Sequence, residues 1–181
     1  MKEVPQHIDV LIPEHEIKAR IKELAQYIAE DYQDKPFIIV SILKGGVQFS
    51  AHLILELGRL NLDPHLSFLG KSSYGKETVS SGRIKTTLAL DTDIEGQDVI
   101  ILDDILDTGL TLKTTLEEDI FPKNPASVKV CVLLDKAEGR EVEVLVDYLG
   151  FSIPKKFVVG FGLDSGENYR SLPYIGVVST S

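Results

Sequence analysis

Three aspartates lie close to a threonine and a glycine in one segment of the sequence, a combination that could bind a phosphorylated sugar. Residues 99–111 read VIILDDILDTGLT, so Asp103 and Asp104 follow an apolar run and Asp107 begins the tripeptide Asp-Thr-Gly. The apolar run predicts a buried strand, and ligands of open α/β sheets bind where such strands end. The two carboxylates could contact ribose hydroxyls directly or through Mg²⁺.

The turn after these carboxylates has the features of a monophosphate site. Gly109 allows a close approach of the backbone, and the N–H groups of residues 108–111 would lie at the start of a helix. Each part alone has a simpler interpretation. An aspartate pair also ends a strand in receiver domains, and Asp-Thr-Gly can be an Asx turn. The complete strand–turn–helix segment is much more specific than its parts.

The rest of the chain alternates short apolar runs with amphipathic stretches, a pattern typical of α/β proteins. Apolar spacing predicts helices over residues 14–32, 47–60 and 111–120. Strands are predicted over residues 37–43, 65–69, 84–90, 98–102, 128–134, 157–163 and 174–178. The polar, glycine-bounded segment 70–83 predicts a mobile loop or the tip of a hairpin.

Composition limits the class of protein. With 181 residues and 43% hydrophobic residues, the chain fits one folded domain. Lys+Arg 19 against Asp+Glu 28 gives a net charge of −9, which argues against a wide surface for nucleic acids. No apolar stretch has the length of a membrane span. We expect a cytoplasmic protein without nucleic-acid or membrane partners.

The cysteine and the histidines give no candidate site. The single cysteine, Cys131, lies in an apolar run and is interpreted as an inert core thiol in a reducing compartment. His7, His15, His52 and His65 are dispersed without metal-ligand spacing, and we assign them no role.

Residues 99–111 resemble the phosphoribosyl-pyrophosphate binding motif of the type I phosphoribosyltransferases. The motif consists of a hydrophobic run, two acids, two apolar residues, Asp-Thr-Gly and a hydroxyl residue. The purine-salvage branch of the family usually has Glu-Asp where this chain has Asp103-Asp104. Since Asp is one methylene shorter than Glu, the ribose contact at position 103 is expected to differ.

Further segments resemble the hypoxanthine–guanine branch, in the same order along the chain. Residues 43–46, LKGG, are similar to a loop that contacts pyrophosphate, often after a cis peptide bond. Residues 72–75, SSYG, resemble the start of a flexible lid, and residues 133–136, LLDK, a strand end with a purine-binding lysine. Residues 156–164 and 168–170 match the carboxyl-terminal signature of the branch.

The resemblance implies a Mg²⁺-dependent purine-salvage enzyme, a pentosyltransferase. It would transfer the 5-phosphoribosyl group from phosphoribosyl pyrophosphate to N9 of hypoxanthine or guanine, giving the nucleoside monophosphate and pyrophosphate. Asp103 and Asp104 are expected to hold the ribose and, with Asp164, the metal. Asp107 is the candidate catalytic base near the purine N7, although it could instead be a helix N-cap.

The remaining ligand contacts are also implied by the resemblance. The 5′-phosphate is assigned to Asp107, Thr108, Gly109, Leu110 and Thr111. Pyrophosphate is assigned to Lys44, Gly45, Arg170 and the lid residues Ser73 and Tyr74. The purine is assigned to Lys136, Phe157, Val158 and Asp164: the lysine would select the 6-oxo group, and Phe157 would stack on the base. The role of Asp135 stays open.

The implied fold is that of the type I phosphoribosyltransferases, with a central parallel sheet of about five strands flanked by helices. The single domain would have a core over about 35–150, a small hood from the amino-terminal segment and about 151–181, and a lid over about 70–83. A homodimer or homotetramer is expected.

Two other functions fit parts of the pattern. One is a sister enzyme that prefers xanthine, which also carries the 6-oxo group. The other is a regulator of the same fold that senses phosphoribosyl pyrophosphate and binds RNA. The acidic charge and the carboxyl-terminal segment favour the enzyme over the regulator.

Overall fold

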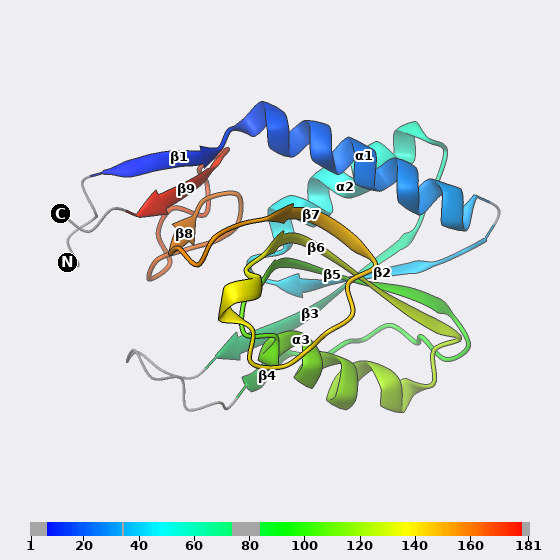
Figure 1. Ribbon diagram of the computed structural model, residues 1–181. Coiled ribbons are helices and arrows are strands. Elements are labelled where there is room, and N and C mark those ends of the chain that lie inside the picture. Colours follow the sequence, from blue (N-terminus) through cyan, green and yellow to red (C-terminus); the bar gives the residue numbers. More distant parts are fainter. Residues whose placement is uncertain (1–6, 34, 74–83, 179–181) are drawn as a thin grey trace.

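The computed structural model describes residues 7–33, 35–73 and 84–178. Its centre is a six-stranded sheet in the order β4-β3-β2-β5-β6-β7 (Figure 1). The neighbouring strands are parallel except β3 and β4, which are antiparallel. The strands are β2 (Ile38–Leu43), β3 (His65–Ser73), β4 (Ile84–Leu88), β5 (Asp98–Leu106), β6 (Ser127–Asp135) and β7 (Tyr148–Ser152). The α/β class and the mostly parallel central sheet are therefore confirmed.

Helices cover both faces of this sheet (Figure 1). On one face lie α1 (Glu14–Tyr32) and α2 (Val47–Arg59). On the other lies α3 (Leu110–Thr114), which continues as a π-helix (Thr115–Ile120) and a 3-10 turn (Phe121–Lys123). Because both faces are covered, β5 is apolar on both: Ile100 and Leu102 pack on one side, and Val99 and Ile101 on the other.

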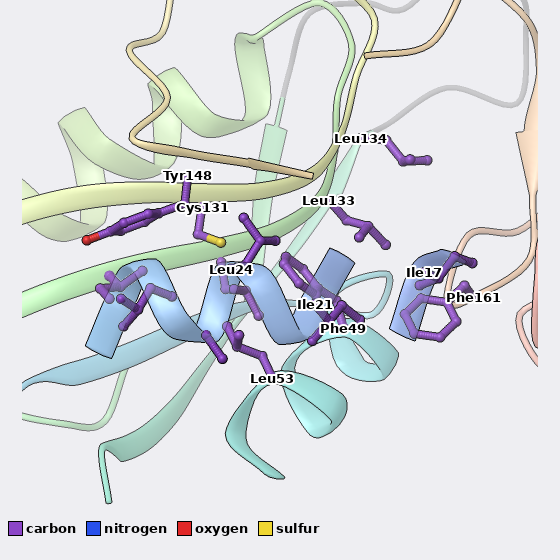
Figure 2. Close-up of a cluster of buried hydrophobic side chains, with 14 of the residues drawn as sticks. Ile17, Ile21, Leu24, Phe49, Leu53, Cys131, Leu133, Leu134, Tyr148 and Phe161 are labelled. Carbon is purple, nitrogen blue, oxygen red and sulfur yellow. The ribbon is translucent and has the colours of Figure 1, made fainter. Parts of the chain in front are cut away.

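The larger hydrophobic cluster fixes α1 and α2 against the sheet (Figure 2). Ile17, Ile21 and Leu24 of α1 are fully buried at helical spacing, and Phe49 and Leu53 of α2 are buried in the same cluster. Burial of each such side chain contributes about 1.5–3 kcal/mol. Because α2 begins directly after the loop that ends β2, this packing also fixes the position of the loop, which forms one wall of the cleft described below.

A second, smaller sheet joins the two ends of the chain. It has the antiparallel order β1-β9-β8, with β1 (Ile8–Ile12), β9 (Ile175–Val178) and β8 (Val158–Val159). Figure 1 shows it beside the carboxyl ends of the central strands. The division into core, hood and lid stays a prediction. No helix in the described part of the chain combines the length and apolarity needed to cross a membrane.

Several predicted elements are wrong in extent. The strand predicted over 98–102 continues to Leu106, so the two aspartates lie inside it. The strand predicted over 157–163 is limited to residues 158–159, because residues 160–162 all have positive φ (97°, 49° and 103°) and turn the chain. The helix predicted over 111–120 is α-helical only over Leu110–Thr114, and Thr115–Ile120 continue it as a π-helix. β1 and β7 were not predicted.

Candidate active site

A cleft of about 820 Å³ opens at the carboxyl ends of the central strands, and Val158 of the small sheet is part of its lining. Eleven of the residues assigned from the sequence line it, from segments up to 126 positions apart. They are Lys44, Gly45, Asp103, Asp104, Asp107, Thr111, Lys136, Phe157, Val158, Asp164 and Arg170. Thr108 and Gly109 lie in the adjoining turn and Leu110 begins α3, but none of the three is part of the lining. Tyr74 and the side chain of Ser73 fall outside the described residues.

The two adjacent aspartates of β5 form a buried acidic pair at the base of this cleft. Asp103 is 5% exposed and Asp104 8%. Burial raises the pKa of both carboxyls, and the neighbouring charge of Asp104 raises the pKa of Asp103 further. Asp103 accepts a hydrogen bond from the backbone N–H of Asp104 at 3.1 Å, and within the described residues neither carboxylate forms an ion pair with Lys or Arg. A cation or hydroxyl donors from a ligand would satisfy this pair.

The loop after β2 presses directly against the acidic pair. The peptide bond between Leu43 and Lys44 is cis. A Cβ at Gly45 would overlap the carboxylate of Asp104, and a Cβ at Gly162 would overlap the carbonyl oxygen of Gly45. Gly45 and Gly162 are thus required as glycines, because the loop after β2, the end of β5 and the segment around Gly162 meet beside the cleft.

Asp107 and Lys136, which the sequence treats as separate candidates, form an ion pair. Lys136 Nζ lies 3.1 Å from Asp107 Oδ2, and the lysine side chain is 9% exposed. The N-cap of α3 is Gly109, with φ 87° and no side-chain cap, so the interpretation of Asp107 as a helix N-cap is wrong. The hydroxyl of Thr108 accepts a hydrogen bond from the N–H of Leu110 at 3.3 Å.

The two cations assigned to pyrophosphate are both paired with acids of one loop. Arg170 Nη2 lies 2.9 Å from Asp164 Oδ1, and Lys44 Nζ lies 3.2 Å from Glu167 Oε2. Hydrogen bonding to Lys44 lowers the pKa of the Glu167 carboxyl, and Arg170 lowers it further. Sequence reasoning missed Glu167, although an acid between Asp164 and Arg170 was a visible signal.

Lys71 is a second residue of the cleft that the sequence analysis missed. Its side chain is only 1% exposed, is paired with Asp119, and donates to the hydroxyl of Thr86 at 2.9 Å. No sequence signal separates it from a solvated lysine, because both partners come from distant segments.

The acidic residues do not form a closed metal cage. In the described ranges, no three His, Cys, Asp or Glu side chains are grouped as a metal site. Magnesium usually takes one or two carboxylates together with water and substrate oxygens. The buried pair Asp103–Asp104 fits an ion that is held in this way.

The chain is similar to known proteins in both sequence and structure. Residues 8–166 match the family described as the phosphoribosyl transferase domain. The hypoxanthine-guanine phosphoribosyltransferase of Dictyostelium discoideum is 48% identical over 169 residues, which cover 93% of each chain. That of Bacillus subtilis (strain 168) is 45% identical over 170 residues, 93% of this chain and 92% of the relative. A crystal structure of a hypoxanthine-guanine phosphoribosyltransferase from Bacillus anthracis superposes with a TM-score of 0.86 at 39% identity, covering 96% of this chain and 100% of that one.

Proposed function

The chain belongs to the phosphoribosyl transferase family, and from this premise we propose that it is a purine-salvage enzyme, a hypoxanthine–guanine phosphoribosyltransferase. The observation that carries the proposal is the single cleft in which the acidic pair, the Asp107–Lys136 ion pair and Arg170 meet. It offers carboxylates for a ribose, a buried ammonium for a base and a guanidinium for a phosphate.

The reaction exchanges one bond at C1 of the ribose. The bond from C1 to the pyrophosphate oxygen breaks, and its electron pair leaves with pyrophosphate. A bond from C1 to N9 of the purine forms, and the purine loses one proton. The site must therefore stabilise a developing cation on the sugar and a developing anion on pyrophosphate, and it must keep water out.

Asp107 and Lys136 support the handling of the purine. We assign the carboxylate of Asp107 to hold the proton at N7 of the base, and the ammonium of Lys136 to donate to O6. The ion pair at 3.1 Å keeps the two groups at neighbouring positions of the cleft. Adenine would present an amino donor to this ammonium, so the same lysine selects 6-oxopurines.

The wall of the purine site comes from β8 and the residue before it. Phe157 is 55% exposed and lines the cleft, so its ring has a face on which a base can stack. Val158 is buried beside it, and we assign its backbone to the edge of the base.

Asp103 and Asp104 are the proposed ligands for the ribose hydroxyls and for Mg²⁺. When bound, Mg²⁺ supplies positive charge that stabilises the leaving pyrophosphate. Asp164, proposed as a third ligand near the purine, accepts bonds from Arg170 and from the N–H of Glu167. Each carboxylate oxygen can accept a second bond, so these partners do not exclude the assignment.

The remaining assigned residues are proposed to bind the 5′-phosphate and pyrophosphate. We assign the 5′-phosphate to the segment Asp107–Thr111, in which Gly109 has a positive φ of 87°. Pyrophosphate is assigned to Lys44, Gly45 and Arg170, with Ser73 and Tyr74 from the lid. Of the two cations, Lys44 is paired with Glu167 and Arg170 with Asp164.

The remaining proposals concern the whole protein. The buried thiol of Cys131 fits a reducing compartment, and we propose the cytoplasm. We also propose a homodimer or homotetramer, which sedimentation equilibrium distinguishes from a monomer.

The test is a set of initial rates with phosphoribosyl pyrophosphate and Mg²⁺ against hypoxanthine, guanine, xanthine, adenine and uracil. Turnover restricted to hypoxanthine and guanine is expected. If the rate were highest with xanthine, the chain would instead be the sister enzyme that prefers xanthine. No turnover with any purine, while phosphoribosyl pyrophosphate still binds, would contradict the enzyme and return the regulator as the candidate.

A further inference from the structure

Behind Asp107, on the side away from the cleft, lies a largely buried arginine that the assigned chemistry does not use. Arg140 belongs to the segment between β6 and β7, and its side chain is 11% exposed. Neither Arg140 nor its partner Asp135 lines the active-site cleft; both line a separate hollow of about 450 Å³. The contacts of Arg140 are instead with the backbone of the catalytic turn and with Asp135.

The guanidinium of Arg140 joins the ends of two neighbouring strands. Its Nε donates to the carbonyl oxygen of Asp107 at 3.1 Å, and its Nη2 donates to that of Leu106 at 3.4 Å. The same Nη2 is paired with the carboxylate of Asp135, the last residue of β6. One side chain thus holds the end of β5, the first residue of the catalytic turn and the end of β6.

The backbone of the same segment also contacts the turn directly. The N–H groups of Glu141 and Val142 both donate to the carbonyl oxygen of Thr108, at 2.9 and 3.0 Å. A Cβ at Gly139 would overlap the carboxylate of Asp107, and a Cβ at Gly109 would overlap the carbonyl oxygen of Val142. The turn from Asp107 to Gly109 is therefore supported along its length by one neighbouring segment.

Two ion pairs lie on opposite sides of the turn. Lys136 pairs with Asp107 on the cleft side, and Arg140 pairs with Asp135 behind it. Removal of the guanidinium would leave the carbonyl oxygen of Asp107 and the carboxylate of Asp135 without this donor, whereas the carbonyl oxygen of Leu106 would keep the N–H of Lys136 at 2.9 Å. The turn would then relax, and the Asp107 carboxylate would move relative to the base.

We propose that Arg140 is a positioning residue for the reaction, which fixes the Asp107 carboxylate beside Lys136 and is itself held by Asp135. The inference rests on the role assigned to Asp107 under the proposed function. A displacement of a reacting group by about 1 Å can lower a rate about 100-fold, so a support of this kind affects turnover rather than only stability.

The main variant is Arg140→Gln, assayed for kcat and KM with hypoxanthine and for the Kd of phosphoribosyl pyrophosphate. We expect kcat to fall about 10–100-fold, while the Kd changes by less than about threefold. Arg140→Lys should recover part of kcat, because it keeps the charge but not the planar fork of donors. An unchanged kcat in Arg140→Gln would overturn the proposal.

Arg20 provides a matched control. It also donates to two backbone carbonyl oxygens, those of Leu149 and Gly150, and pairs with a carboxylate, that of Glu23, but it lies on α1. Arg20→Gln should lower the melting temperature and leave kcat and KM unchanged. If both variants lower kcat in proportion to their loss of stability, Arg140 is only structural and the proposal fails.

A double-mutant cycle with Asp107→Asn separates this proposal from the function on which it rests. If Arg140 acts through Asp107, Arg140→Gln should lower kcat by less than about threefold in the Asp107→Asn background. A full multiplicative loss overturns the positioning role alone. Wild-type turnover in Asp107→Asn itself overturns both the assigned chemistry and the inference.

Discussion

At the scale of single residues, the ion pair between Asp107 and Lys136 brings together two side chains 29 positions apart in sequence. The motif of residues 99–111 identifies the aspartate, and the end of an apolar run identifies the lysine. Their contact at 3.1 Å links the assigned proton acceptor and the assigned base selector, so each can be tested with the other in place.

Replacement of Asp107 tests the assigned base. Asp107→Asn keeps the shape of the side chain and removes its proton acceptor, so we expect kcat to fall by about 100-fold or more. Calorimetry should show phosphoribosyl pyrophosphate binding within about threefold of the wild type. Asp63→Asn, at an exposed position, is the control and should be fully active. Unchanged turnover in Asp107→Asn contradicts the assignment.

Replacement of Lys136 tests the selection of the base. In Lys136→Ala the donor to O6 is lost, so the preference for hypoxanthine over adenine in kcat/KM should fall about 10-fold or more. The Kd of phosphoribosyl pyrophosphate should change much less. Lys22→Ala, an exposed lysine of α1, serves as the control. Equal losses in sugar binding and in base selection would contradict a specific role.

Glycine substitutions test the close contact beside the acidic pair. In Gly45→Ala the new methyl group meets the carboxylate of Asp104, so kcat/KM for phosphoribosyl pyrophosphate should fall about 10-fold or more. In Gly58→Ala nothing lies within 4 Å of the new Cβ, and this α2 position should gain about 0.5–1 kcal/mol of stability. Equal activity of the two variants would show that the Gly45 contact is unimportant.

At the scale of elements, polar contacts as well as apolar packing hold α1 on the edge of the sheet. Asp31 near the end of α1 accepts hydrogen bonds from Lys129 of β6 at 2.7 Å and from the hydroxyl of Tyr148 of β7. Hydrogen bonding to Lys129, followed by that to Tyr148, lowers the pKa of the Asp31 carboxyl. This cluster ties one helix to the two strands that end beside Lys136.

The pH dependence of stability tests this cluster. An acid whose pKa is lower in the folded state stabilises the fold above its unfolded value of about 3.9, and this contribution is lost as the pH falls through the folded value. Asp31→Asn should therefore cost up to about 1 kcal/mol at pH 7, limited by partial exposure, and less at about pH 3, below the unfolded pKa, where part of this contribution is lost. Urea unfolding of both proteins at the two pH values measures it. A cost that does not depend on pH would exclude the ionic contribution.

At the scale of the whole molecule, the cleft lies where segments from most of the chain converge. Within it, two buried carboxylates lack an ion-pair partner among the described residues. Occupation of the cleft should therefore be coupled to the stability of the entire domain.

Thermal unfolding measures this coupling. Phosphoribosyl pyrophosphate with Mg²⁺ at about 100 times its Kd contributes about 2.7 kcal/mol, which corresponds to a rise in Tm of about 5–10 °C for a domain of this size. EDTA should remove most of this shift, because the acidic pair then faces the ligand without a cation. A shift of the same size with EDTA would exclude the proposed metal.

Much of the fold could be predicted from the sequence. Ile17, Ile21 and Leu24 recur at helical spacing, and the structure buries all three in α1. The apolar run before Asp103 identified β5, and the acidic pair and turn after it carried the family resemblance. These features are local, because a helix or a buried strand is determined largely by the periodicity of its own residues.

Tertiary structure alone determined which side chains meet. Whether a charged group pairs with another depends on segments that share no local pattern, so the contacts of Lys71 with Asp119 and of Arg140 with Asp107 could not be predicted. The same holds for the length of β5: its aspartates are polar, yet pairing with β6 extends the strand to Leu106. The sequence by itself determined the class of fold and the chemistry of the motif, and the packing of distant segments determined its geometry.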